Sequence, residues 1–474
     1  MFNIHSCLMK DSIDLYDNIA SIGDCQGRLK TTFHINPALG IMWEFESVGD
    51  FACEPASLNG KLKNPIIGHN HTIQEAYLSP MSTWSSNDGK IRRMVGSSPS
   101  AFYGQLDIKC NSFLFALPNC KFQVTSKSGQ NFLENEVSIK NKQSKEIYSS
   151  SSVGRFFKTK FQDNWTIELV IENDAFNWLS NQTIKQGTFL TTIGRYYYGD
   201  VSNNNEIPED QKISLEEGLN KIDRLTLLIS FANGGLIAPL IFETANEFPE
   251  YKNHKIFTPY PITPIEQIGT SWALFDSDIK SFINCFPAFE RMLQKEIWSE
   301  RFGIVLMWYF QVIQPQSLQM QGKPWPVIAN ALGALLELLF YIICIEEETD
   351  NEKKAYCLKK LNSQKSSEER ISLLLDKIGV DTYIEKTFLF GKEEPKNFIA
   401  LFRQLRNDAT HPIQKRKDFD PDDGIDYVLQ QATQWVEEVI LWRIGYSGKY
   451  RDRFRNGRKS REPRYDLSKR DSSW

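Results

Sequence analysis

Several motifs that define common enzyme classes are missing from this sequence. It contains no GxxxxGK[ST] phosphate loop, no HExxH pair, no GxSxG elbow and no GxGxxG fingerprint. Nucleotide hydrolysis and metalloprotease chemistry are therefore poorly supported. The eight cysteines are scattered and form no CxxC pair. Such scattering is typical of reduced thiols and argues against a disulfide framework or a zinc site.

Histidine is also scarce. Of the six histidines, only His69 and His71 are close in sequence, and they flank a predicted turn. Polar residues exposed on a turn explain them better than metal ligands do. We therefore expect neither a metal nor a cofactor.

Targeting signals are not evident either. Residues 1–18 lack a basic start followed by an apolar run, so we expect no signal peptide and a cytoplasmic location. The apolar stretch 327–345 is long enough to span a bilayer. However, it contains Asn330 and Glu337, and an acidic side chain at the centre of a membrane is costly. We predict a buried helix and no membrane partner.

The 474 residues are 41% hydrophobic and 12% aromatic, which is enough for globular domains. Residues 1–255 show strand-like runs separated by polar turns and predict a β-rich domain, a sandwich or barrel. One helix is expected inside it, beginning with a capping box at Ser214 and Glu217 and ending at the glycines 234–235.

The pattern changes to helical spacing over 256–446, with Pro287 and the prolines of 324–326 as punctuation. This region predicts an all-α bundle, with a helix stop at Gly445. The expected fold class is therefore α+β and multidomain, a β-rich domain followed by a helical one.

Residues 447–474 form a separate basic tail. Between 449 and 470 it has ten Lys or Arg and three acidic residues, with Tyr450, Phe454 and Tyr465 interleaved. This composition is typical of a nucleic-acid-binding arm. We expect RNA contacts from Arg451, Arg453 and Arg455, and a merely solvated tail is the alternative.

The segment 405–412, LRNDATHP, places an arginine, an amide, an acid and a histidine at the end of an amphipathic helix. On a continuous helix the side chains of Arg406 and His411 would diverge by about 140°. Because Pro412 disfavours the helical conformation at His411, we predict that the helix ends near 408–410. His411 would then turn back toward Arg406.

An arginine beside a histidine suits RNA cleavage, in which the 2′-hydroxyl is the nucleophile. The reaction needs a base for that proton, an acid for the 5′-oxygen and positive charge for the phosphorane. His411 fits the first two roles and the guanidinium of Arg406 fits the third. A solvated helix end is the alternative interpretation.

Glu337 lies alone in an apolar helix, and a buried acid usually has a cationic partner. Arg406 is one candidate, and a structural ion pair elsewhere is the other. Further RNA contacts are expected from the cations that flank the motif, with a charged loop as the alternative. These cations are Arg403, Lys415, Arg416 and Lys417.

The segment LRNDATHP, between two long amphipathic helices, resembles the Arg-Asn-x3-His signature of HEPN-domain ribonucleases. The wider layout is similar to ApeA-like antiphage defence proteins, as are IIGHNHTIQEAYL, 214–242 and NALGALLELL. This resemblance implies that Arg406, Asn407 and His411 are the catalytic set, paired across a homodimer. It also implies an N-terminal domain that senses a phage-derived or small-molecule trigger.

The first hypothesis is thus a metal-independent endoribonuclease of an abortive-infection system. The second is a nucleic-acid-binding regulator without catalysis, which uses the bundle as a dimerisation scaffold. A third makes the strand-rich domain a receptor for a ligand or protein.

Overall fold

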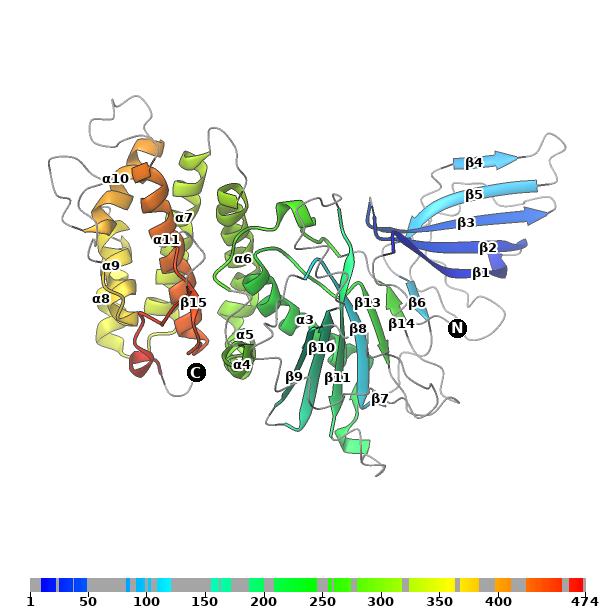
Figure 1. The fold of residues 1–474 in the computed structure, drawn as a ribbon, viewed down its shortest axis with the longest axis horizontal. Coiled ribbons are helices and arrows are strands. Elements are labelled where there is room, and N and C mark those ends of the chain that lie inside the picture. Colours follow the sequence, from blue (N-terminus) through cyan, green and yellow to red (C-terminus); the bar gives the residue numbers. More distant parts are fainter. Residues whose placement is uncertain are drawn as a thin grey trace. The chain divides into compact units, whose positions relative to one another are not determined.

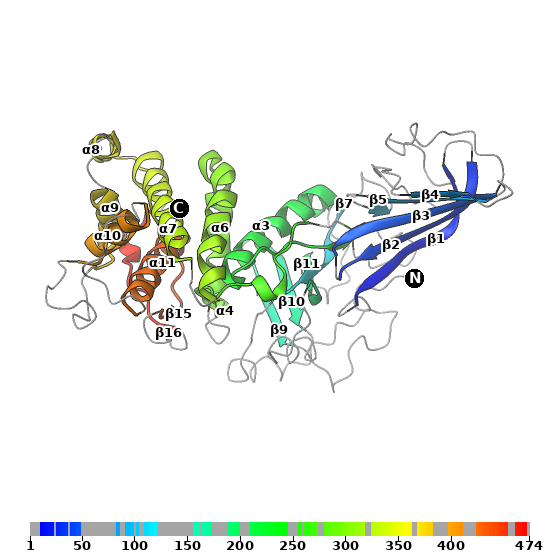
Figure 2. The same cartoon turned by 90° about the horizontal axis from the view of Figure 1, so that it is seen from above.

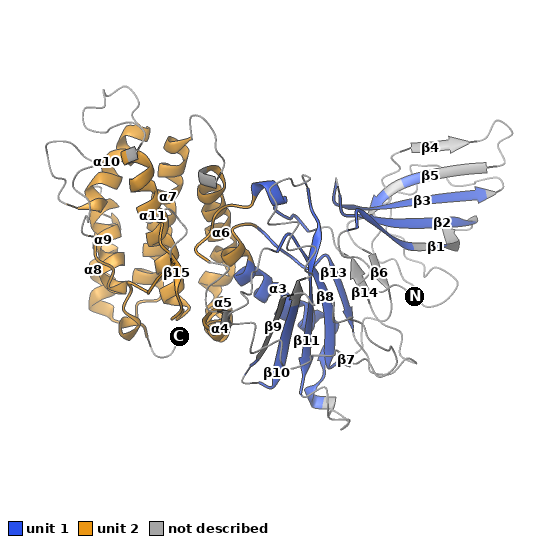
Figure 3. Cartoon of the chain, in the orientation of Figure 1, with its two compact units in different colours: residues 1–229, 236–267 blue, residues 230–235, 268–474 orange. Residues whose placement is uncertain are grey.

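The computed structural model divides the chain into two compact units (Figure 3). Unit 1 comprises residues 1–229 and 236–267, and unit 2 comprises 230–235 and 268–474. The residues that the structure describes are 10–22, 25–36, 38–48, 82–85, 91–98, 101–103, 109–120, 155–161, 163–171, 187–199, 209–244, 255–257, 260–273, 279–317, 324–362, 367–382, 397–410, 423–453 and 460–471.

The first sheet of unit 1 is antiparallel, in the order β1-β2-β3-β5-β4. Its alternate residues point inward, as Phe33 in β2 and Ile35 just after it do, and as Trp43 and Phe45 in β3 do. This two-residue period is the pattern that predicts strands. The strands are β1 Ser12–Ile22, β2 Cys25–His34, β3 Gly40–Val48, β4 Ser82–Ser85 and β5 Ile91–Ser98 (Figure 1).

The second sheet has seven strands in the order β6-β14-β13-β8-β11-β10-β9. They are β6 Ala101–Tyr103, β8 Ser112–Pro118, β9 Arg155–Lys160, β10 Trp165–Ile171, β11 Leu190–Tyr198, β13 Ile241–Thr244 and β14 Lys255–Phe257. A short pair joins β7 Lys109–Cys110 to β12 Ile213–Ser214. One apolar cluster joins the two sheets, with Phe33 and Ile41 from the first and Ile193 and Ile241 from the second.

Helix α3, Leu215–Asn233, follows β12 directly. Its capping box is formed in both directions: Glu217 N–H donates to Ser214 Oγ at 3.1 Å, and Ser214 N–H donates to Glu217 Oε2 at 2.8 Å. Gly234 follows with φ +81°, a left-handed conformation that suits glycine. Both predicted ends of this helix are confirmed.

Unit 2 is helical, which confirms the α+β class. Its helices are α4 Ile279–Asn284, α5 Phe286–Gln294, α6 Glu296–Ser317, α7 Trp325–Tyr341, α8 Asn351–Asn362, α9 Ser367–Ile378, α10 Phe398–Thr410 and α11 Asp423–Arg443. A π-helical turn, Ile342–Glu346, extends α7. As predicted, Pro287 lies in the first turn of α5, and Gly445 has φ +71° just after α11.

Two helices form the interior of the bundle. Helix α7 lies beside α6, α9, α10 and α11, as both views show (Figures 1 and 2). Every residue of α11 from 431 to 443 is buried. Residues Trp325–Glu346 are long and apolar enough to cross a membrane, but most of them are buried among these helices. The apolar stretch 327–345 is thus a core segment of the bundle.

Candidate functional site

Helix α10 is positioned by one apolar face. Its buried residues follow helical spacing and pack toward α7 and α11. They are Phe398, Ile399, Leu401, Phe402 and Leu405. Asn397 caps the first turn, because its side-chain oxygen accepts from Ala400 N–H at 2.8 Å. This packing fixes the rotation of α10 and brings Arg406 alongside α7.

Arg406 forms an ion pair with Glu337 of α7. Its Nη1 donates to Glu337 Oε1 at 2.7 Å. The two side chains are 26% and 30% exposed, so the pair lies at the edge of the core with access to solvent. The expectation that Glu337 has a cationic partner, with Arg406 as a candidate, is confirmed.

A glycine makes room for this arginine. A Cβ at Gly333, one turn before Glu337, would lie 2.6 Å from Nε and 2.7 Å from Cδ of Arg406. The Arg406 guanidinium therefore lies directly on the backbone of α7. The sequence analysis did not identify this role for Gly333.

A second arginine reaches the same carboxylate oxygen. Arg370 of α9 donates from Nη2 to Glu337 Oε1 at 3.3 Å and from Nη1 to the Leu361 carbonyl at 3.4 Å. Its Nε is buried and has no hydrogen-bond partner among the described residues. One carboxylate thus faces two guanidinium groups, which leaves the cluster with a net positive charge. Arg370 lies four residues before the buried Leu374 and therefore on the same face of α9, toward the core. This spacing is the feature of the sequence from which Arg370 could have been found.

The other described residues of the predicted site lie farther out. Arg403 is half exposed and donates to Glu368 at 2.6 Å, an exposed pair of the kind that adds little stability. Asn407 is exposed. The Thr410 hydroxyl donates to the Arg406 and Asn407 carbonyls at 3.2 and 3.0 Å and closes the last described turn. Helix α10 thus reaches at least Thr410.

Several predicted site residues lie outside the described part of the chain. They include His411, so the structure does not test whether it turns back toward Arg406. The others are Lys415, Arg416, Lys417 and Arg455, together with the two histidines near residue 70.

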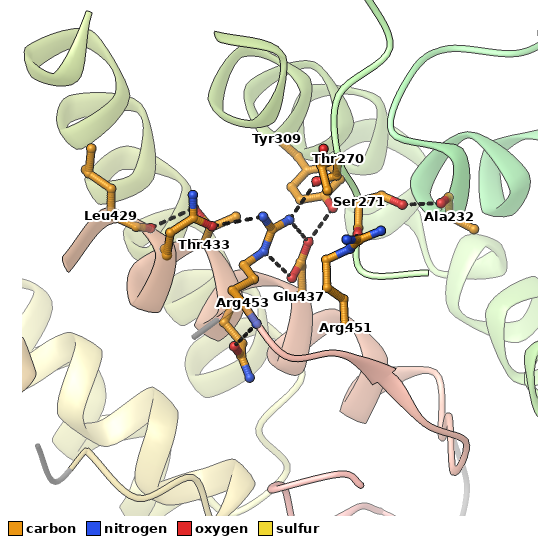
Figure 4. A network of polar contacts seen from close by, with 11 residues as sticks. Ala232, Thr270, Ser271, Tyr309, Leu429, Thr433, Glu437, Arg451 and Arg453 are labelled. Carbon is orange, nitrogen blue, oxygen red and sulfur yellow. Dashed lines mark hydrogen bonds and ion pairs between the residues drawn. The ribbon is translucent and has the colours of Figure 1, made fainter. Parts of the chain in front are cut away.

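The C-terminal segment is packed onto the bundle, which corrects the expectation of an exposed basic arm. Arg453 is buried: its Nε donates to Glu437 at 2.8 Å and its Nη2 donates to the Thr270 carbonyl at 2.9 Å (Figure 4). Burial alone would lower the pKa of Arg453, but Glu437 outweighs it and the net pKa is raised. Tyr309 donates to the same carboxylate. Arg453 therefore has a structural role and is not exposed for contact with RNA.

Other described residues of this segment are also held by the fold. Arg451 donates from Nε to the Ser271 carbonyl at 2.8 Å, and burial lowers its pKa. Arg464 makes a two-pronged contact with Glu438, at 2.7 Å for each bond. Tyr450 and Tyr465 are buried and stack on each other, so neither can stack on a base. Two of the three interleaved aromatic residues, Tyr450 and Tyr465, thus build a small core instead of contacting RNA, and Phe454 lies outside the described residues.

A further buried pair closes the bundle. Glu347 accepts from Arg443 at 2.6 Å twice, and from Lys295 at 2.8 Å. Burial acts to raise the pKa of Glu347, but its two cationic partners outweigh burial and hold the pKa below its usual value. Glu347, which follows the apolar stretch 327–345, thus has a structural role.

The family model described as the YopA C-terminal domain matches residues 295–464. This range begins at the Lys295 that pairs with Glu347 and ends at the Arg464 that pairs with Glu438. The match assigns neither a HEPN domain nor an ApeA-type domain. No curated protein and no solved structure matches the chain. Over residues 295–464, the chain is similar to the YopA C-terminal domain.

Proposed function

We propose that the helical unit is a metal-independent endoribonuclease of the HEPN type, with Arg406, Asn407 and His411 as its catalytic set. The observation that supports this most is the position of Arg406. Glu337 and Gly333 hold its guanidinium at the edge of the core, and the group stays partly exposed. A cation held in place needs little reorganisation when an anion arrives.

In this proposal the RNA 2′-hydroxyl attacks the adjacent phosphorus. The new P–O2′ bond forms as the P–O5′ bond breaks, which leaves a 2′,3′-cyclic phosphate and a 5′-hydroxyl. His411 handles the protons, and Arg406 stabilises the charge that develops on the phosphorane. Apart from the bond to Glu337, the side chain of Arg406 makes no hydrogen bond to a described residue, so its other donors are available to a phosphate.

The test is to incubate the purified full-length protein with RNA and to map the ends of the fragments. We expect cyclic phosphate and 5′-hydroxyl ends, with cleavage that persists in EDTA. Arg406→Lys keeps the positive charge but loses the planar set of N–H donors of the guanidinium. His411→Ala removes the imidazole that transfers the protons. Each should reduce cleavage by about a hundredfold or more. Lys353→Gln, an exposed change on α8, should leave it unchanged.

The outcomes separate the hypotheses. Fragments with 3′-hydroxyl ends would rule out this mechanism. RNA binding without cleavage, equal in the wild type and in His411→Ala, would favour the noncatalytic regulator. If the protein neither binds nor cleaves RNA, the third hypothesis is favoured, in which the strand-rich domain is a receptor and the bundle is its scaffold.

We also propose that the nuclease acts as a homodimer. The sequence resemblance supports this, and a second copy would cover the exposed apolar side chains of Met307 on α6 (52% exposed) and Val327 on α7 (62% exposed). Met307→Glu should convert the dimer to a monomer in mass photometry. A monomeric wild-type protein would contradict this part of the proposal.

The sequence resemblance supports a place in antiphage defence of the abortive-infection type, with unit 1 as the sensor of a phage-derived or small-molecule trigger. Cells that express the wild type should resist phage, whereas cells that express Arg406→Lys should not. Equal protection by the wild type and by Arg406→Lys would show that defence does not depend on RNA cleavage.

A further inference from the structure

Helix α8 is attached to the bundle through very little apolar surface. Cys357 is its only buried residue, although all twelve of its residues are described. Its neighbours Tyr356 and Leu358 are among the exposed large hydrophobic side chains. An element with so few buried contacts opens locally at low free-energy cost. Access to the thiol of Cys357 is therefore controlled by the detachment of α8.

The partner of Cys357 is a second thiol. Cys344 lies in the π-helical turn after α7 and is buried. Each thiol shifts the pKa of the other through a hydrogen bond between them. They are thirteen positions apart in sequence and lie on different elements that pack together.

A cation borders this pair. Lys377 of α9 donates from Nζ to the Ile343 carbonyl at 3.0 Å and to Glu348 at 2.7 Å. The hydrogen bond from Cys344 lowers the pKa of Cys357 to about 7; burial opposes this effect, Lys377 assists it and Glu348 opposes it. The same hydrogen bond raises the pKa of Cys344. The pair is thus asymmetric, with one sulfur that ionises and one that keeps its proton.

We propose that Cys357 and Cys344 form an oxidation site that takes a hydroperoxide and closes a disulfide between α8 and the turn after α7. The burial of both thiols on two elements that pack together, and the weak attachment of α8, carry this inference. It does not depend on ribonuclease activity.

The chemistry balances in two steps. The Cys357 thiolate attacks the outer oxygen of the hydroperoxide, an S–O bond forms, the O–O bond breaks, and the leaving alkoxide or hydroxide takes up from solvent the proton that Cys357 had released. The Cys344 sulfur then attacks the sulfenic sulfur, the S–S bond forms, and water leaves with the thiol proton. Two electrons pass from the thiols to the peroxide. The product pins α8 to the bundle.

The experiment treats the reduced full-length protein with hydrogen peroxide and follows it by intact mass and peptide mapping. We expect the loss of two hydrogen atoms, a cross-linked pair of peptides containing Cys344 and Cys357, and reversal by dithiothreitol. Amide hydrogens of α8 should exchange at least several-fold more slowly in the oxidised protein. The rate should rise about tenfold from about pH 6 to about pH 8, because the Cys357 thiolate becomes more abundant.

Cys285→Ser is the matched control, because Cys285 is also buried in unit 2 but its Sγ donates to the Phe282 carbonyl at 2.8 Å. It should form the same cross-link as the wild type, whereas Cys344→Ser should show peroxide oxidation of Cys357 without a cross-link. Sulfinic acid on wild-type Cys357 with no disulfide, or a cross-link to another cysteine, would overturn the proposal. Both of these outcomes are read from the wild-type protein, so the result does not depend on how any variant folds.

Discussion

Arg406 and Arg370 show how two cations can be held beside an apolar core. Each reaches Glu337 from a different helix, at 2.7 and 3.3 Å. The shared carboxylate reduces the repulsion between the two guanidinium groups without neutralising both. This arrangement orders the Arg406 side chain, so under the proposed function less conformational entropy would be lost when a phosphate binds.

At the same scale, Asp223 on α3 gives a pH-dependent prediction for unit 1. Burial raises its pKa from the ordinary value of 3.8 to about 6. Because the folded-state pKa exceeds the unfolded one, its contribution to stability is complete below about pH 4 and is lost as the pH rises through about 6.

Asp223→Asn should therefore stabilise the protein at neutral pH by about 1 kcal/mol, a value reduced for the partial exposure of the group. Urea unfolding of the wild type and the variant at several pH values measures this difference. The exposed Asp210→Asn is the control. An Asp223→Asn variant that loses stability at about pH 8 would contradict the prediction.

Among the elements, α7 and α10 decide the candidate site together. Helix α10 presents Arg406 because its apolar stripe fixes its rotation, and α7 receives the guanidinium because residue 333 lacks a side chain. A glycine in a helix interior costs about 1 kcal/mol relative to alanine. The close approach of Arg406 explains why a glycine is accommodated there.

Gly333→Ala separates stability from activity. The added methyl should displace Arg406 and lower RNA cleavage by about tenfold or more, while the thermal midpoint stays the same or rises because alanine favours the helix. Gly303→Ala on α6 is the matched control, because a Cβ there meets no atom within 4 Å. Equal activity of the two variants would show that the position of Arg406 does not matter for catalysis.

At the scale of the whole molecule, the C-terminal segment stabilises unit 2 by pairing with buried acids of the bundle. It supplies Arg453 and Arg464 to two acids of α11, Glu437 and Glu438, which are fully buried. Removal of one partner from such a pair leaves a buried charge, which typically costs about 3–5 kcal/mol.

Arg453→Met should accordingly lower the free energy of unfolding of unit 2 by about 3–5 kcal/mol in urea titrations. Lys449→Met, which removes an exposed partner of Glu462, should have little effect. Arg453→Met and Glu437→Met together should recover part of the loss, since no unpaired charge remains. If Arg453→Met is as stable as Lys449→Met, the buried pair of Arg453 and Glu437 does not stabilise unit 2.

The sequence by itself determined the features that depend on near neighbours. The capping box of α3, the breaks at Pro287 and around 324–326, the stop at Gly445 and the change from strand to helix periodicity all act over a few residues. A local pattern suffices there because the hydrogen bonds and the backbone angles are themselves local. The partner of Glu337 was anticipated for a different reason, since a lone acid in an apolar helix requires a cation.

Only the tertiary structure decided what the basic residues do. The same tail composition fits an RNA-binding arm and a packed segment, and the choice depends on acids that lie far away in sequence. Arg443 meets Glu347 across 96 positions, and Arg370 meets Glu337 across 33. Charge and periodicity do not encode such partners, because the side chains meet only after the helices have packed and excluded water from between them.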